Sequence, residues 1–228
     1  MPTQLSRSFT YWYAPPINGG HQFADQFLGR VQELGEFTTV EQFWSLYCHL
    51  IRPSNLQMNS SFYVFRTGVT PLWEDPTNQA GGRLLARVPK ALSSRCWENL
   101  LLALIGEQLS ATFSEEDTNF ICGIEVTTKK AHDVLSVWHS EDSKRMTHAL
   151  REAAQRALAL PVMLQWEYRK NAESVHSSHG GGASMPVGSP PSFGSPVQSP
   201  TGHHHHHQDQ HHQQHHHHHH PRQQINFS

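Results

Sequence analysis

The sequence lacks a strong charge of either sign. Its 228 residues carry a formal net charge of −2 at pH 7, counted with neutral histidines, and the pI is about 6.8. Proteins that bind along a nucleic-acid backbone irrespective of sequence need an extended positive field. Any nucleic-acid contact in this protein is therefore expected to be local.

Cysteines are also few, and long apolar runs are missing. Cys48, Cys96 and Cys122 are odd in number, lack the spacing of a zinc site and lie in apolar contexts, so we expect buried, reduced thiols. No apolar run approaches the ~18 residues of a membrane span, and the amino-terminal residues do not resemble a signal peptide. These absences predict a soluble, intracellular protein without membrane contact.

Aromatic residues almost stop after Lys170. All six tryptophans and five tyrosines precede it, so we expect one globular domain at 1–170 and a disordered Ser/Pro/Gly- and His-rich tail at 171–228. The histidine runs are read as a solvated spacer, with loose metal binding or charging below about pH 6.5 as alternatives. Each of Ser189, Ser195 and Ser199 precedes proline, as at sites of proline-directed kinases.

Apolar periodicity predicts six strands and three helices. The helix at 38–51 is expected to begin with a capping box of Thr38 and Glu41, and the helix at 94–109 with Ser94 as its cap. A third helix is expected at 142–158, and strands at 9–13, 61–65, 83–88, 120–127, 133–138 and 162–168. This order favours an α+β fold, in which helices cover one side of an antiparallel sheet.

One loop stands out chemically. Thr70-Pro-Leu-Trp-Glu-Asp-Pro76 places Trp73 beside Glu74, and Gly81-Gly-Arg83 brings an arginine on the next strand. A flat π-face, a paired acceptor and a guanidinium suit a cationic, phosphorylated ring that donates hydrogen bonds. Catalytic motifs and spaced histidine pairs are missing, so we expect no enzyme activity, no metal and no cofactor.

Several motifs occur together in one order: Val40-Glu-Gln-Phe-Trp44, Leu72-Trp-Glu-Asp75, Gly81-Gly-Arg83, Ile105-Gly-Glu107, Ile121-Cys-Gly123 and Val137-Trp138. From about Phe9 to Tyr168 the chain resembles the translation initiation factor 4E family, which binds messenger-RNA caps. Arg95-Cys-Trp-Glu-Asn99 and Tyr11-Trp-Tyr13 resemble its second class, the animal 4E-homologous protein and the plant novel cap-binding protein. The resemblance implies a curved antiparallel sheet with three helices on its convex face and the cap slot on the concave side.

The resemblance also implies roles for individual residues. Trp73 matches one stacking face for 7-methylguanine, and Phe27 the other, with Phe23 as the alternative. Glu74 matches the carboxylate that accepts the base N–H groups. Trp138 matches the contact to the N7 methyl group, although a core aromatic would fit the same pattern.

The predicted phosphate contacts are Arg83, Lys129 and Lys130. The first class has further lysines where this chain has Ala131 and Val134. Together with a phenylalanine in place of one stacking tryptophan, this difference predicts weaker cap binding than in the first class.

A partner site is implied on the helices. It matches the groove for a helical Tyr-x-x-x-x-Leu-Φ peptide of a 4G-type scaffold, a 4E-binding protein or a repressor, and its residues are Val40, Trp44, Leu102, Ile105, Gly106 and Glu107. Asn99 replaces a first-class glutamate. We therefore expect a monomeric, cytoplasmic cap reader that competes with initiation, with the nucleus and RNA granules as other locations. The alternative is a general initiation factor that recruits ribosomes through a 4G-type scaffold.

Overall fold

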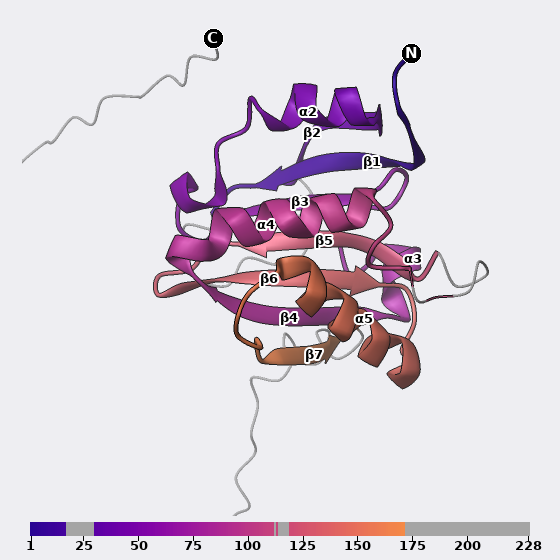
Figure 1. The fold of residues 1–228 in the computed structure, drawn as a ribbon, viewed down its shortest axis with the longest axis vertical. Helices are drawn as coiled ribbons and strands as arrows, with labels where there is room; N and C mark the ends of the chain where they lie inside the picture. Colours follow the sequence, from indigo (N-terminus) through magenta and orange to yellow (C-terminus); the bar gives the residue numbers. More distant parts are fainter. Residues whose placement is uncertain (17–29, 112, 114–118, 172–228) are drawn as a thin grey trace, which may run out of the picture. The chain divides into compact units, whose positions relative to one another are not determined.

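The computed structural model describes residues 1–16, 30–111, 113 and 119–171, and these form one antiparallel sheet with helices (Figure 1). The seven strands lie in the order β2-β1-β3-β5-β6-β4-β7, and every neighbouring pair is antiparallel. Their bounds are β1 Gln4–Ala14, β2 Gln32–Thr39, β3 Ser61–Arg66, β4 Gly82–Pro89, β5 Ile121–Thr127, β6 His132–His139 and β7 Trp166–Lys170.

Three longer helices lie on the same face of the curved sheet: α2 Val40–Tyr47, α4 Lys90–Ile105 and α5 Lys144–Leu158 (Figure 1). A short helix α3 at Pro76–Gln79 and a 3-10 turn η1 at Pro53–Asn55 complete the described elements. The predicted α+β class and the helix-backed antiparallel sheet are confirmed. The tail predicted at 171–228 lies outside the described residues except for Asn171, so the domain boundary stays a prediction.

Strand β2 was not predicted, because its sequence QELGEFTT is polar and has few β-branched residues. It forms by pairing with β1, where Phe9 lies opposite Phe37 and the two rings stack at 5.8 Å. Pairing and one buried aromatic pair thus outweigh weak local β propensity.

The helix starts differ from the predicted ones by small shifts. In α2 the capping box is formed by Thr39 and Gln42, one residue after the predicted Thr38 and Glu41: the Gln42 N–H donates to the Thr39 hydroxyl at 3.1 Å, and the Gln42 side chain accepts from the Thr39 N–H at 3.2 Å. The helix ends at Tyr47, so the predicted end at Ile51 is wrong.

Helix α4 begins at Lys90, directly after β4, and ends at Ile105, so Ser94 is not its cap. The Ser94 hydroxyl instead accepts the Ser54 N–H at 3.1 Å and joins the helix to η1. Strand β7 begins later than predicted, because the Gln155 side chain bonds to the backbone of Val162 and Leu164 and holds that segment against α5.

The main core lies between the sheet and the helices. Trp97 of α4 is fully buried there, and its Nε1–H donates to the Tyr11 hydroxyl of β1 at 2.9 Å. Cys96 and Cys122 are buried as expected, but Cys48 is exposed at the end of α2, so that prediction is wrong for one thiol. In the part of the chain that is described, no helix has the length and apolar character to cross a membrane.

A second, smaller apolar cluster lies on the opposite face of the sheet. It contains buried Ala14, Tyr63, Phe65, Val69, Cys122 and Trp138, and Trp12, Val31 and Trp73 pack against it. This cluster is the base on which the candidate site is built.

Candidate nucleic-acid interface

The open face of the sheet is hollowed between strands β4, β5, β6 and β7. Because side chains alternate along a strand, Leu84 and Ala86 of β4 face the helices, whereas Arg83 and Arg87 face the hollow. The hollow has a volume of about 250 Å³, and its lining consists of Arg83, Leu85, Arg87, Glu125, Thr127, Lys129, Val134, Ser136, Glu167 and Arg169.

The Trp73–Glu74 loop is fixed by its neighbour Asp75. The Asp75 carboxylate accepts the N–H of Thr70 at 2.8 Å and the N–H of Thr77 at 2.9 Å, which closes the loop and caps α3. Trp73 is half-buried on the second apolar cluster. The Glu74 carboxylate has no hydrogen-bond partner among the described residues, so its acceptor oxygens are available to a ligand.

Arg83 and Glu125, which line the hollow, form one interacting group with the buried Trp138. The Arg83 guanidinium carbon lies 4.6 Å from the centre of the Trp138 ring, and the Trp138 Nε1–H donates to Glu125 Oε2 at 3.0 Å. Arg83 Nη1 lies 3.9 Å from the same oxygen. The group therefore fixes one cation over an aromatic ring and a buried carboxylate.

Trp138 itself is 4% exposed and meets Phe65 edge-on with ring centres 5.4 Å apart. This burial agrees with the alternative interpretation of Trp138 as a core aromatic residue. The contact between Trp138 and the N7 methyl group of the cap stays a prediction. Glu125 also makes Tyr63 harder to ionise: burial, followed by the nearby Glu125 charge, raises the pKa of the Tyr63 hydroxyl.

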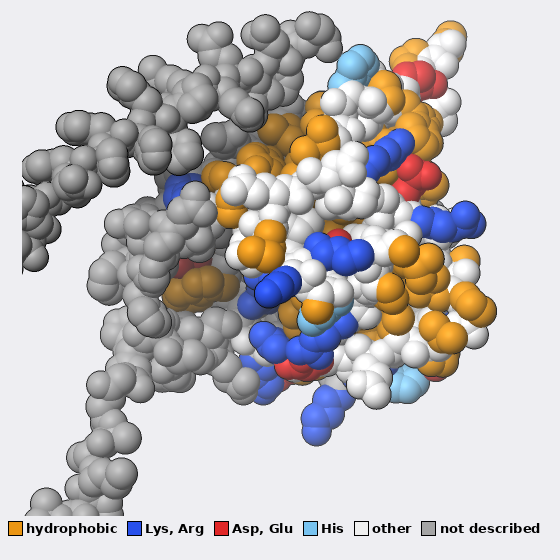
Figure 2. Space-filling model, turned by 90° about the vertical axis from the view of Figure 1, so that its left-hand side faces the viewer, with side chains coloured by type: hydrophobic (Ala, Val, Ile, Leu, Met, Phe, Trp, Pro, Cys, Tyr) orange, Lys and Arg blue, Asp and Glu red, His pale blue; other side chains and the backbone are white. Residues whose placement is uncertain are grey.

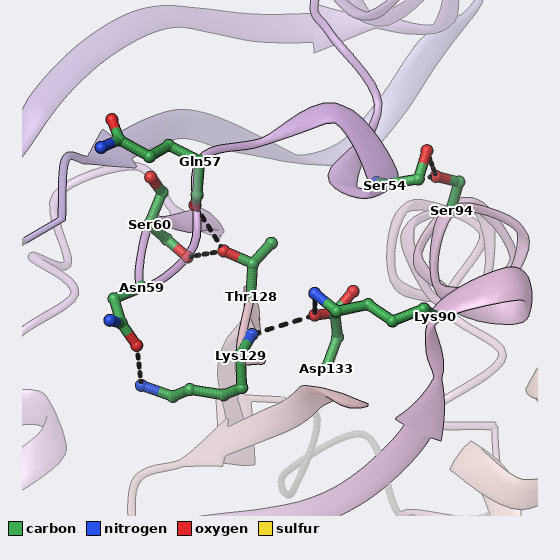
Figure 3. Close-up of polar contacts among 9 residues, drawn as sticks. All are labelled: Ser54, Gln57, Asn59, Ser60, Lys90, Ser94, Thr128, Lys129 and Asp133. Atoms are coloured by element: carbon green, nitrogen blue, oxygen red, sulfur yellow. Dashed lines mark hydrogen bonds and ion pairs between the residues drawn. The ribbon is translucent and has the colours of Figure 1, made fainter. Parts of the chain in front are cut away.

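Lys129 lines the hollow from the turn between β5 and β6. Figure 3 shows the polar contacts that hold this turn. The backbone N–H of Lys129 donates to Asp133 at 3.0 Å, and its ammonium group reaches Asn59 at 3.4 Å. Asp133 is fully buried and also accepts from the Lys90 ammonium at 2.5 Å. The Thr128 hydroxyl donates to the Gln57 carbonyl at 2.7 Å, which ties the turn to the preceding loop.

The remaining predicted cap residues are less constrained. Lys130 is exposed in the same turn. Figure 2 shows several Lys and Arg side chains gathered on the face turned toward the viewer. Phe27 and its alternative Phe23 lie outside the described residues, so the second stacking face stays a prediction. Within the described ranges, no three His, Cys, Asp or Glu side chains are grouped as a metal site.

Four charged residues of the hollow were missed by sequence reasoning: Glu125, Arg87, Glu167 and Arg169. The alternation of β4 shows that Arg87 shares a face with Arg83. The other three could not be found in this way, because their placement depends on which strands are neighbours in the sheet.

The predicted partner residues lie on the helix face. Trp44 of α2 and Leu102 of α4 are exposed to 41% and 37%, so both offer apolar surface to a partner. Val40 is half-buried, Ile105 is buried, and Gly106 and Glu107 are exposed. Glu107 accepts from Ser6 at 2.5 Å and so contacts β1.

The chain matches the family described as eukaryotic initiation factor 4E over residues 4–184. It belongs to this family. The translation initiation factor NCBP of Triticum aestivum is 36% identical over 175 residues, which cover 76% of this chain and 72% of that relative. Initiation factor 4E-4 of Caenorhabditis elegans is 36% identical over 173 residues, with 75% and 77% covered. These matches confirm the resemblance to a second-class member of the 4E family.

Solved structures of family members show the same fold. The complex of C. elegans eIF4E-3 with the 4E-binding protein Mextli and a cap analog has a TM-score of 0.68 at 27% identity and covers 77% of this chain and 96% of that chain. Ascaris suum eIF4E-3 with an m7G cap has a TM-score of 0.65 at 29% identity, with 81% and 96% covered.

Proposed function

We propose that this protein binds the 7-methylguanosine cap of messenger RNA on the open face of its sheet and regulates translation as a second-class cap reader. The observation that carries the proposal is the connection between Trp73 and the cationic side chains: Trp73 packs on the cluster that contains Trp138, and Trp138 lies under Arg83, one of four cationic residues that line the hollow. The carboxylate of Glu74, next to Trp73, has no hydrogen-bond partner among the described residues. The named cap ligands of the Caenorhabditis and Ascaris structures support it.

Each part of the cap meets a suitable group. The methylated base carries a positive charge, and stacking it on an indole contributes about 1–2 kcal/mol when water is excluded. Glu74 can accept two N–H groups of guanine, and a site built for two donors rejects adenine. Arg83, fixed over Trp138, and Lys129 supply charge for the phosphates.

We further propose that cap affinity is lower than in first-class members and that the protein competes with initiation. Ala131 and Val134 are apolar where that class has lysines, and the carboxylates of Glu125 and Glu167 reduce the positive charge of the hollow. On α4, the Asn99 amide donates to the Leu158 carbonyl at 3.1 Å, so it serves the contact with α5 instead of offering a partner a negative charge.

The alternative, a general initiation factor, would use the apolar surface that Trp44 and Leu102 expose on the helix face. A helical peptide from a 4G-type scaffold fits such a surface. The named 4E-binding protein in the Caenorhabditis complex shows that a family member takes a protein partner. Capture on cap resin from a translation extract distinguishes the roles: a co-purifying 4G-type scaffold supports initiation, and its absence supports competition.

The cap-binding proposal is tested by fluorescence titration with m7GTP and GTP. Wild type should prefer m7GTP, Trp73→Ala should abolish most of the quenching, and Glu74→Gln should lower affinity roughly 30-fold, because charge-assisted hydrogen bonds contribute about 2 kcal/mol. Glu152→Gln on α5 is the matched control for charge. Equal affinity of wild type for the two nucleotides would contradict the proposal.

A further inference from the structure

Two arginines of the hollow have no role in the proposed cap contacts. Arg87 projects from β4 and Arg169 from β7, and their side chains are 62% and 51% exposed. Both line the same hollow as Arg83 and Lys129, on its β7 side.

The strand register brings like charges together. Arg83 and Arg169 lie directly opposite each other on β4 and β7, and both side chains face the hollow. A directly opposed pair of like charges destabilises a sheet unless an anion lies between or beside them. In the free protein Arg83 lies 3.9 Å from Glu125, and Arg169 pairs with Glu167, which lies two residues before it in β7.

Glu167 lies between Arg87 and Arg169 and contacts both. Its Oε1 accepts from Arg169 Nε at 2.7 Å, and its Oε2 lies 3.7 Å from Arg87 Nη2. The hydrogen bond from Arg169 lowers the pKa of the Glu167 carboxyl, so it is ionised at neutral pH. The carboxylate is half solvent-exposed at 44%, and exposed ion pairs of this kind are weak and exchange readily.

We propose that Arg87 and Arg169 form a second phosphate-binding position beside Arg83, and that phosphate oxygens of a capped ligand displace Glu167 from them. Guanidinium groups bind phosphate with paired, charge-assisted hydrogen bonds, which are stronger than an exposed bond to one carboxylate oxygen. Arg87 and Arg169 would thus supply positive charge that the first class is expected to obtain from lysines at the positions of Ala131 and Val134. This inference rests on the proposed cap binding. The phosphates come either from the cap triphosphate or from the first nucleotides of the RNA.

The test measures the affinities of wild type, Arg87→Gln, Arg169→Gln and Glu167→Gln for 7-methylguanosine, m7GTP and a capped ten-nucleotide RNA. Each arginine variant should bind phosphate-bearing ligands about 3- to 10-fold more weakly, and the slope of log affinity against log salt should fall by about 0.7 for the RNA. Glu167→Gln should bind them more tightly, because the competing anion is removed. Arg95→Gln, an exposed arginine on α4 behind the sheet, is the matched control.

The pattern of losses identifies the phosphate source. Loss for both m7GTP and RNA assigns the position to the triphosphate, and loss for RNA alone assigns it to the following nucleotides. A purely structural ion-pair network predicts weaker binding in Glu167→Gln as well, and that result would overturn the inference, as would equal losses for the nucleoside or no loss at all. If wild type does not prefer m7GTP over GTP, the proposed function itself fails. If it does and the arginine variants are unchanged, only this inference fails.

Discussion

His139, the last residue of β6, is predicted to make folding stability depend on pH. Its ring is buried in a stack between Phe120, with centres 4.7 Å apart, and Tyr168, with centres 5.4 Å apart. Nδ1 lies 3.0 Å from the Glu141 carbonyl oxygen, which can only accept, so Nδ1 carries the proton of the neutral ring. Burial lowers the pKa of His139 from 6.5 to about 4.

The sign follows from comparing the folded and unfolded chains. Above about pH 6.5 the ring is neutral in both states, so it contributes no pH dependence. Between about pH 6.5 and 4 the unfolded chain binds a proton that the folded chain excludes, so the free energy of unfolding decreases as the pH is lowered. The pKa values differ by about 2.5 (6.5 minus about 4). At 1.36 kcal/mol per unit, about 3 kcal/mol of the free energy of unfolding is lost in full below pH 4.

Urea unfolding of three proteins at pH 7.5 and pH 4.5 measures this loss. His139→Phe keeps a stacked ring but cannot titrate, so its stability should depend less on pH than that of wild type, by about 2–3 kcal/mol over this range. His148→Gln removes a histidine that is 69% exposed and should behave like wild type. If wild type and His139→Phe lose the same stability on acidification, the reasoning about His139 is refuted.

Three further outcomes are expected. Tyr11→Phe should lower the free energy of unfolding by about 1–3 kcal/mol in urea, because the buried Trp97 N–H loses its acceptor; a double-mutant cycle with Trp97→Phe in which the two losses simply add would argue against this pair. Asp75→Ala should weaken m7GTP binding in the titration, because the loop that carries Trp73 loses two hydrogen bonds; unchanged affinity would show that the loop is held otherwise. Trp44→Ala should weaken binding of a Tyr-x-x-x-x-Leu-Φ peptide by about 2 kcal/mol or more in calorimetry and leave m7GTP affinity unchanged; an equal effect on both ligands would place Trp44 in the core instead.

Local patterns were sufficient where one segment determines its own structure. Helix α5 follows its apolar face, with Met146, Leu150 and Ala153 buried, and the turn between β5 and β6 was predicted between 127 and 133. Trp73 and Glu74 likewise lie in a loop, as predicted, and hydrogen bonds from Thr70 and Thr77 to Asp75 close it. In these cases sequence neighbours supply most of the contacts.

Features that depend on distant segments were not predictable from the sequence. Strand β2 exists because β1 lies beside it. Arg169 lies opposite Arg83 because β7 pairs with β4, and no local sequence pattern encodes the register of that distant pairing. Even helix starts were ambiguous, since Thr38 with Glu41 and Thr39 with Gln42 both fit a capping box. The pairing of Thr39 with Gln4 of β1 extends β2 to Thr39, so the helix begins after it.

Strand β7 is one edge of the described sheet, and its sequence WEYRK places charged side chains on a backbone that lacks a second neighbour. Unpaired edge strands invite pairing with strands of other molecules, and charged residues there oppose it. Arg169 and Glu167 therefore keep the protein from aggregating through this edge as well as lining the hollow. Replacement of these residues by apolar ones would leave an edge that strands of other molecules can pair with, so we expect such variants to aggregate more readily than wild type.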